Sequence, residues 1–390
     1  MNIDKATFFE PEIPRKTQVD LDQAIDAALT LLGRTKRLTI LVNDPQRNTS
    51  TAPVLTLLGR RFSPADMRML VATGTHNISA DQRREHESQI RSVLPVEKIA
   101  WFDCRDAGLV RISGPVAWRG HRWLLESPSL LAIGSVEPHY FAGFTGAHKT
   151  ATIGCASYDD IQANHSKALD PKSRLGALAD NPVHNGIADM LKTLQANRPV
   201  AAVNLAQSGR EILAAAGGEP LEALQNLLPT VRDAFIRHVA PADAIVAYVD
   251  GPLGCSFYQA EKGIKNNEHA VRDGGVIVLA APCPDGIGQD QFAQLLREAQ
   301  TYQAAMEIVQ SRGYRLGDHK AVKLRYLTDP AHHGVRIFVV SDGISQEQAD
   351  SLGVTKAATV EEALRTAGID PARHAVYCVR DAGNLCLLPQ

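Results

Sequence analysis

The sequence predicts an α/β fold made of two α/β domains with mostly parallel sheets and an interdomain cleft. Short apolar runs rich in β-branched residues recur along the chain and alternate with segments of helical periodicity. This alternation is typical of parallel sheets that helices cover on both faces. The length of 390 residues exceeds what one hydrophobic core usually holds, which favours two domains.

The predicted strands are apolar runs without polar alternation, as expected of strands that are buried on both faces. Ligands of parallel sheets bind beyond the carboxyl ends of the strands, so the residues after each run are the best functional candidates. The runs cover residues 38–42, 69–72, 99–102, 130–133, 200–203, 244–249, 276–279 and 335–340.

The segments between these runs predict amphipathic helices. Asn181 and Pro182 mark one helix start, because asparagine caps a helix and proline fits its first turn. The predicted helices include residues 21–32, 182–195, 221–239 and 292–309.

The predicted domain boundary lies in residues 237–243, which close one helix and precede a new series of apolar runs. We therefore assign residues 1–238 to an N-terminal domain that carries most of the candidate site. Residues 239–390 form a C-terminal domain that closes the cleft, and its last residues can pack back on the first domain.

Charge and composition restrict the possible partners. The formal net charge is −2, so no basic field favours nucleic acid or an anionic membrane. The longest apolar run, residues 274–282, is far shorter than the roughly 20 residues of a membrane span. The N-terminus lacks a signal-peptide pattern, and the six cysteines include no CxxC pair. We expect a cytoplasmic protein with reduced thiols.

Two loops after predicted strands carry candidate chemistry. Asp44 and Arg47 lie three residues apart after the first run, where a guanidinium can clamp a carboxylate or phosphate. A helix cap with a solvated arginine is the alternative. His76 ends the loop after the second run, where a histidine can act as an acid or base near neutral pH. A surface histidine is the alternative there.

Residues 134–150 are unusually rich in glycine, aromatic residues and histidine for a structural connector. A phosphate-binding P-loop is excluded, because that motif requires glycine directly before its lysine and His148 precedes Lys149. The composition of the segment still favours a functional loop.

Two further candidates lie on predicted helices. His165 shares a helix face with apolar residues, which usually indicates a core histidine, and no HExxH or CxxC motif predicts a protein-only zinc site. Gln259 and Lys262 share a face in the second domain and can offer an amide and a positive charge to an anion. An ordinary amphipathic first turn is the alternative.

Taken together, these segments resemble the nickel-dependent lactate racemase family over nearly the whole chain, in the same order. The spacing between Lys149 and His165 also agrees with that family. The matching features are Asp44-x-x-Arg47, Ala72-Thr73-Gly74-Thr75-His76, Glu137-Pro138-His139-Tyr140-Phe141-Ala142-Gly143 followed by Lys149, His165, Tyr258-Gln259-x-x-Lys262 and residues 274–279.

The resemblance implies a nickel-pincer nucleotide, the Ni(II) complex of pyridinium-3-thioamide-5-thiocarboxylic acid mononucleotide. Lys149 matches the family's covalent tether, and His165 matches the histidine that completes the square-planar coordination of nickel. Enzymes of cofactor biosynthesis are then expected partners. The residues that match the cofactor-binding loops are Asp44, Thr73, Gly74 and Thr75.

The resemblance also implies a racemase or epimerase that inverts C2 of a 2-hydroxy acid by hydride transfer through the cofactor. His76 and His139 match the acid/base residues. Ala147 and His148 stand where lactate racemases usually have glycine and arginine, which leaves open whether the substrate is lactate or a larger or more acidic relative. The residues that match the substrate-binding groups are Arg47, Tyr258, Gln259 and Lys262.

Two other classes of function compete with this interpretation. A homologue that binds a nucleotide or keto acid without turnover would not need the paired acid and base, His76 and His139. A metal-dependent hydrolase would need a chelating pair of histidines, which the sequence lacks.

Overall fold

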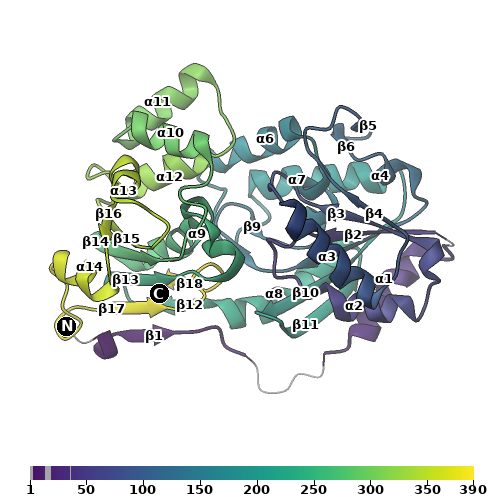
Figure 1. Ribbon diagram of the computed structural model, residues 1–390, viewed down its shortest axis with the longest axis horizontal. Coiled ribbons are helices and arrows are strands. Elements are labelled where there is room, and N and C mark those ends of the chain that lie inside the picture. The colour runs from purple at the N-terminus through teal and green to yellow at the C-terminus, as the bar shows by residue number, and fades with distance from the viewer. Residues whose placement is uncertain (1–2, 14–18, 36) are drawn as a thin grey trace.

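The computed structural model describes residues 3–13, 19–35 and 37–390. Within them lie two six-stranded sheets, one in each half of the view in Figure 1. The predicted α/β fold with mostly parallel sheets is confirmed, because nearly all strand pairs in both sheets are parallel.

The first sheet has the order β11-β10-β7-β2-β3-β4, and only its edge pair β10–β11 is antiparallel. Successive residues of a strand point to opposite faces, so Ile40 and Leu41 of β2 lie in different apolar clusters. The strands are β2 (Leu38–Asn43), β3 (Met67–Ala72), β4 (Lys98–Trp101), β7 (Leu130–Ser135), β10 (Val200–Ser208) and β11 (Glu211–Gly218).

Helices cover both faces of this sheet, as the continuous apolar strands predict. α1 (Leu21–Leu32), α2 (Thr51–Gly59) and α3 (Ala80–Val93) bury apolar residues against one face. The other face is covered by α4 (Trp123–Glu126), α5 (Ala147–Ala151), α6 (Tyr158–Ser166) and α7 (Pro182–Gln195), and α8 (Pro220–Phe235) packs beside β10 and β11.

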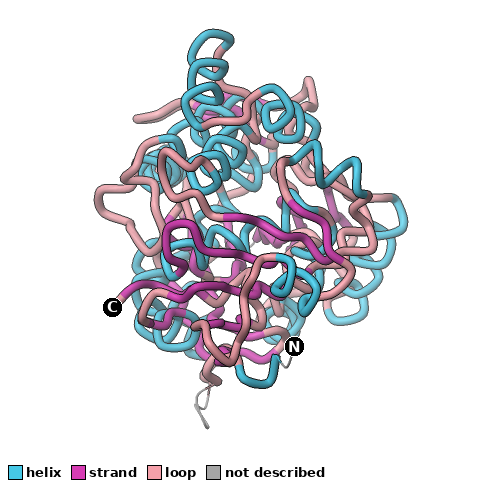
Figure 2. The backbone as a smooth tube through the Cα atoms, turned by 90° about the vertical axis from the view of Figure 1, so that its left-hand side faces the viewer, coloured by secondary structure: helices cyan, strands magenta, loops and turns pink. Residues whose placement is uncertain are grey.

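The second sheet is entirely parallel and has the order β1-β17-β13-β14-β15-β16. In Figure 2 it faces the viewer, and helices pack above its strands. Its strands are β1 (Thr7–Phe9), β13 (Ala242–Tyr248), β14 (Val271–Ala280), β15 (Arg336–Val340), β16 (Thr355–Ala357) and β17 (Val376–Val379).

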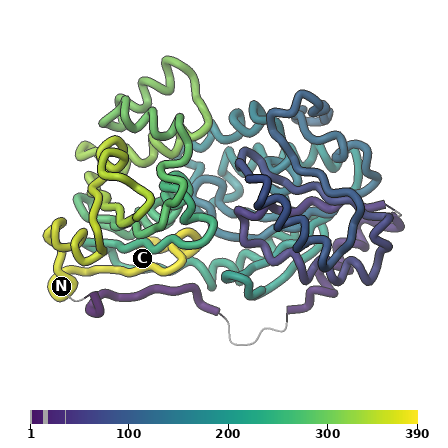
Figure 3. Tube along the Cα trace, viewed as in Figure 1, coloured from purple at the N-terminus to yellow at the C-terminus, as the bar shows by residue number. Residues whose placement is uncertain are grey.

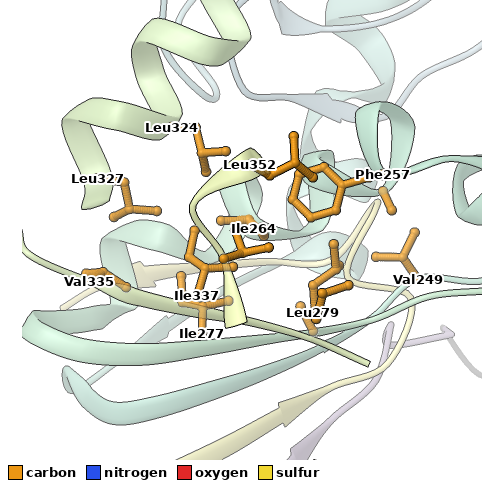
Figure 4. Close-up of a cluster of buried hydrophobic side chains, with 14 of the residues drawn as sticks. Val249, Phe257, Ile264, Ile277, Leu279, Leu324, Leu327, Val335, Ile337 and Leu352 are labelled. Atoms are coloured by element: carbon orange, nitrogen blue, oxygen red, sulfur yellow. The ribbon is translucent and has the colours of Figure 1, made fainter. Parts of the chain in front are cut away.

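The core of the second half lies between this sheet and the helices that follow β13 and β14. Phe257 and Ile264 of α9 pack there with Leu279 of β14 and Ile337 of β15 (Figure 4). These helices are α9 (Phe257–Asn267), α10 (Asp290–Glu298), α11 (Tyr302–Arg312), α12 (Asp318–Thr328) and α13 (Gln346–Leu352), and α14 (Val360–Thr366) covers the opposite face.

Two predicted helices are corrected. The helix predicted over residues 221–239 ends at Phe235, and the next four residues form the short strand β12 (Ile236–Val239). The helix predicted over residues 292–309 is two helices, α10 and α11. The second helix, α11, begins directly after Thr301, whose side chain accepts a hydrogen bond from the backbone N–H of Ala304 and so caps it.

The first and last strands of the chain pair with strands that are distant from them in the sequence. β1 pairs with β17, and Phe9 packs edge-on against Tyr377 at 5.1 Å, so this segment joins the second sheet although it precedes residue 238. Figure 3 shows the N-terminal segment running beside the C-terminal strand. β18 (Cys386–Pro389) pairs with β12. The boundary after residue 238 stays a prediction.

Two small hairpins complete the described strands, and one of them carries site residues. β8 (Pro138–His139) pairs with β9 (Gly143–Phe144), and β5 (Val110–Ile112) pairs with β6 (Trp118–Gly120). None of the described helices is long and apolar enough to cross a membrane.

Candidate active site

Three adjacent strands of the first sheet, β7, β2 and β3, end at the same edge, and the loops that follow them enclose a cavity of about 130 Å³. The parallel arrangement explains this convergence, because carboxyl ends of parallel strands meet at one edge. The predicted residues that line the cavity are Asp44, Arg47, Thr73, Gly74, Thr75, His76, His139, Lys149 and His165.

His76 is held by a buried carboxylate. Its Nδ1 lies 2.9 Å from Oδ2 of Asp44, which is only 2% exposed. The other oxygen of Asp44 accepts a hydrogen bond from the backbone N–H of Gln46 at 2.8 Å. A carboxylate favours the proton on Nδ1, so Nε2 of the neutral ring keeps a free lone pair. His76 is therefore arranged to accept a proton.

His139 has the complementary arrangement. The backbone N–H of Ala142 donates to its Nδ1 at 3.3 Å, so the neutral ring carries its proton on Nε2. Burial lowers the pKa of His139 well below its usual value, and the positive charges of Lys149 and Lys262 lower it further. His139 is therefore a neutral donor at physiological pH.

Lys149 lies on the short helix α5, which packs directly on β7. A Cβ at Gly134 would lie 2.5 Å from the backbone nitrogen of Ala147, so this approach requires glycine in the strand. Burial lowers the pKa of Lys149 to about 7, with further contributions from the charges of Arg47 and Lys262. A large fraction of its amine is neutral near pH 7 and can act as a nucleophile.

His165 projects from α6 and lines the same cavity. Its Nδ1 is buried, and the backbone carbonyl of Ile161 in the preceding turn is the hydrogen-bonding group beside the ring. Burial lowers the pKa of His165 to about 3, so its ring is neutral and can bind a metal ion through a nitrogen lone pair. In the described part of the chain, no three His, Cys, Asp or Glu side chains group so that they could hold a metal ion.

Lys262 reaches this region from the second half of the chain. It is buried on α9, and its Nζ lies 3.7 Å from Oε2 of Glu137, which lines the cavity. Burial lowers the pKa of Lys262. Lys262 is not itself among the residues that line the cavity, whereas Arg47 is, so Lys262 approaches the cavity only through its contact with Glu137.

Tyr258 and Gln259 do not line the cavity. The ring of Tyr258 packs against Phe292 and lies under Nζ of Lys320, at 4.1 Å from the ring centre. Gln259 is partly buried in the first turn of α9. Their contact with a substrate stays a prediction.

The loop after β3 is shaped by its glycine. Gly74 has a φ of +54°, a left-handed conformation that other residues rarely adopt. The hydroxyl of Thr73 donates to the carbonyl of Phe102 at 2.7 Å and so joins this loop to the residue after β4. His76 follows in the same loop, and its side chain contacts the carboxylate of Asp44.

Sequence reasoning missed a chain of hydrogen-bonded polar side chains, most of which line the cavity. Thr150 donates to Asn43 at 2.9 Å, and Asn43 donates to Thr49 at 2.7 Å. The hydroxyls of Thr49 and Ser135 lie 3.2 Å apart, and Ser135 donates to Glu137 at 3.0 Å. Asn43 and Ser135 are the last residues of their strands, a position that could have identified them.

Comparisons with known proteins match most of the chain to one family. Family models described as the lactate racemase N-terminal and C-terminal domains match residues 20–176 and 238–383. A lactate racemase from Thermoanaerobacterium thermosaccharolyticum is 28% identical over 345 residues, which are 85% of this chain and 80% of that protein. A lactate racemase from Lactiplantibacillus plantarum is 26% identical over 326 residues, which are 81% of this chain and 75% of that protein.

Solved structures agree with these matches at the level of the fold. The lactate racemase apoprotein from Thermoanaerobacterium thermosaccharolyticum superimposes with a TM-score of 0.83 at 24% identity, covering 99% of this chain and 96% of the other. A protein from Thermotoga maritima superimposes with a TM-score of 0.75 at 15% identity, covering 98% and 100%.

Proposed function

Because the chain belongs to the lactate racemase family, we propose that it is a racemase or epimerase that inverts C2 of a 2-hydroxy acid. The observation that carries this proposal is the pair of histidines on one cavity. His76 keeps a lone pair on Nε2 that can accept the hydroxyl proton and later return it, whereas His139 presents an N–H at Nε2 that can hydrogen-bond the substrate oxygen. A reaction that removes and returns a hydroxyl proton needs a base at the hydroxyl group and a donor that stabilises its oxygen.

The residues around the cavity also fit the cofactor that the sequence resemblance implies, the nickel-pincer nucleotide. Lys149 has a buried amine whose pKa is lowered to about 7, which suits a covalent tether, and His165 lines the cavity with a neutral ring that suits a nickel ligand. A single histidine suffices when the cofactor brings the other donors to square-planar Ni(II). When bound, this cofactor supplies a reversible acceptor for the C2 hydride.

The chain's own residues then bind the acid and move its hydroxyl proton. Arg47 and Lys262 hold the carboxylate, because both cations stand beside the cavity. His76 takes the hydroxyl proton at Nε2, and Asp44 stabilises the imidazolium that forms. His139 holds the substrate oxygen with a hydrogen bond from Nε2. To serve as the second acid/base group for the other enantiomer, its ring has to move this proton to Nδ1, which now accepts from the backbone N–H of Ala142.

For the substrate we propose lactate or a related 2-hydroxy acid. Two similar proteins are lactate racemases by name. The cavity of about 130 Å³ is well below the roughly 300–1,000 Å³ of pockets for drug-sized ligands, and it has to widen to hold both the nucleotide and an acid. All residues that line the cavity lie between Asn43 and His165, so loops of the first half have to move before a nucleotide can reach Lys149.

The test is to produce the protein together with the cofactor-biosynthesis enzymes and nickel, and to offer it single enantiomers of lactate, malate and an aromatic 2-hydroxy acid. We expect an added mass that peptide mapping assigns to Lys149, and formation of the opposite enantiomer of one acid by chiral chromatography. Protein made without those enzymes is the control. A loaded protein that racemises none of the acids would instead be a non-catalytic binder of the nucleotide.

A further inference from the structure

The loop of residues 381–385 is fastened to the helix that carries Lys262. Asn266 of α9 donates from Nδ2 to two backbone carbonyls of this loop, at 3.2 and 2.8 Å. Asn267 donates from Nδ2 to a third, at 3.2 Å, and its Oδ1 accepts from the backbone N–H of Leu387 at 2.9 Å. Two consecutive side chains thus hold the loop against α9.

The helix and the loop also approach more closely than most side chains would allow. A Cβ at Gly263 would lie 2.5 Å from Cγ2 of Val249 and 3.3 Å from Cβ of Ala382. A Cβ at Gly383 would lie 2.6 Å from Cδ1 of Leu253. Gly263 therefore permits the close packing of α9 on the loop, whereas Gly383 meets only the end of the Leu253 side chain, which precedes α9. Val249 and Ala382 belong to the same apolar core as Phe257 and Ile264 of α9 (Figure 4).

Asp381 organises the loop into a tight turn. Its φ of +53° is left-handed, which is uncommon for a residue other than glycine. Its backbone carbonyl accepts from the N–H groups of Asn384 and Leu385, both at 2.8 Å. The side-chain amide of Asn384 donates to both carboxylate oxygens of Asp381, at 3.0 and 3.2 Å.

These hydrogen bonds fix which way the amide of Asn384 points. Its nitrogen is occupied by Asp381, so its oxygen faces Lys262, with Oδ1 3.5 Å from Nζ. The ammonium also contacts Glu137, with Oε2 at 3.7 Å from Nζ. The amide is a neutral acceptor, so it orients the ammonium without cancelling the charge that an anionic substrate needs.

We propose that Asp381 and Asn384 are positioning residues that hold the ammonium of Lys262 for the carboxylate of the substrate. The inference rests on the proposed role of Lys262 in substrate binding. Without this support, the ammonium of Lys262 is left with Glu137 alone, and the substrate has to compete with this partly buried carboxylate. The pair thus sets the affinity for the acid and leaves the transfer of its hydrogens unaffected.

Four variants test this role. Asp381→Gly removes the carboxylate without backbone strain, because glycine adopts the left-handed conformation freely. Asn384→Ala removes the amide and leaves the turn, and Asp381→Asn keeps an acceptor for Asn384. Arg380→Gln is the matched control, because the neighbouring Arg380 is exposed and pairs with Glu10 on the surface at 3.2 Å.

The first measurement is the kinetics of the loaded enzyme with lactate or whichever acid it racemises. We expect Asp381→Gly and Asn384→Ala to raise KM about tenfold with little change in kcat, as expected when a hydrogen bond to a charged binding group is lost. Asp381→Asn and Arg380→Gln should stay close to wild type. An unchanged KM, or a fall confined to kcat, overturns the proposal.

The second measurement does not depend on racemisation. Unloaded protein is acetylated with an N-hydroxysuccinimide ester, and mass spectrometry of the peptide with Lys262 gives the labelling rate. We expect Asp381→Gly and Asn384→Ala to label several-fold faster than wild type and both other variants, because the freed side chain reaches solvent more often. Equal rates overturn the positioning role, whereas an inactive wild type with these rate differences would refute only the proposed function.

Discussion

Replacing Asp44 by asparagine is predicted to disable His76 while leaving the site intact. One oxygen of Asp44 accepts from the backbone N–H of Gln46 at 2.8 Å, and the other lies 2.9 Å from Nδ1 of His76. In Asp44→Asn the amide oxygen keeps the bond to the backbone, so the amide nitrogen faces His76. Nδ1 then has to accept a hydrogen bond, and the proton moves to Nε2, where the base needs its lone pair.

The size of the effect follows from the contact that is lost. Asp44 is 2% exposed, so the bond to His76 is a charge-assisted one that solvent hardly screens. Hydrogen bonds to charged groups contribute about 1.5–3 kcal/mol, which corresponds to a roughly 10- to 100-fold loss of kcat/KM. The fold should persist, because asparagine has nearly the same shape.

Initial rates from each enantiomer, measured by chiral chromatography on enzyme with equal loading of Lys149, provide the assay. Asp103→Asn is the matched control, because Asp103 also follows a strand of this sheet and accepts from the backbone N–H of Arg105 at 2.9 Å, yet it is exposed. A rate near wild type in Asp44→Asn would refute the assignment of His76 as a base held by this carboxylate.

Three further predictions concern other residues near the cavity. Lys149→Ala should show no added mass and no racemisation, yet it should still unfold cooperatively. The surface variant Lys192→Ala is the control and should bind the cofactor normally. Racemase activity in Lys149→Ala would contradict a covalent tether. His165→Ala should lose nickel by metal analysis while the organic part stays on the protein, and a destabilised variant that holds stoichiometric nickel would identify only a core histidine. His148 is fully buried with both ring nitrogens unpartnered, and burial lowers its pKa well below the usual value. As the pH falls below about 6.5, the His148 ring takes up a proton in the unfolded chain but not in the folded protein, so the free energy of unfolding decreases. Urea titrations of His148→Leu should show a decrease between about pH 7.5 and 5.5 that is smaller than that of wild type by about 1.4 kcal/mol. A decrease equal to that of wild type would contradict this prediction.

The fold was predictable where local pattern determines structure. Continuous apolar runs such as residues 38–42 predict strands covered on both faces, and β2 lies there. The strands β1 and β12 were not predictable in the same way, because each is short and pairs with a strand near the other end of the chain. Such partners are set by tertiary packing, which local periodicity does not report.

The candidate site was predictable to the extent that it lies at strand ends. The loops with Asp44 and His76 follow adjacent parallel strands, so their meeting follows from the topology. Their direct pairing was missed, because the spacing in the sequence suggests that Asp44 acts with Arg47. The contact of Glu137 with Lys262 joins residues far apart in the chain, and no local signal predicts it.

The most direct test of the proposed roles of His76 and His139 is the fate of the C2 hydrogen in heavy water. If both histidines move only the hydroxyl proton, the loaded enzyme should racemise protiated substrate with little deuterium at C2 of the product. Proton NMR of the recovered acid measures this directly, and a protiated sample run in ordinary water is the reference. Substantial deuterium at C2 would mean that a histidine abstracts the C2 proton itself, which would contradict the proposed mechanism.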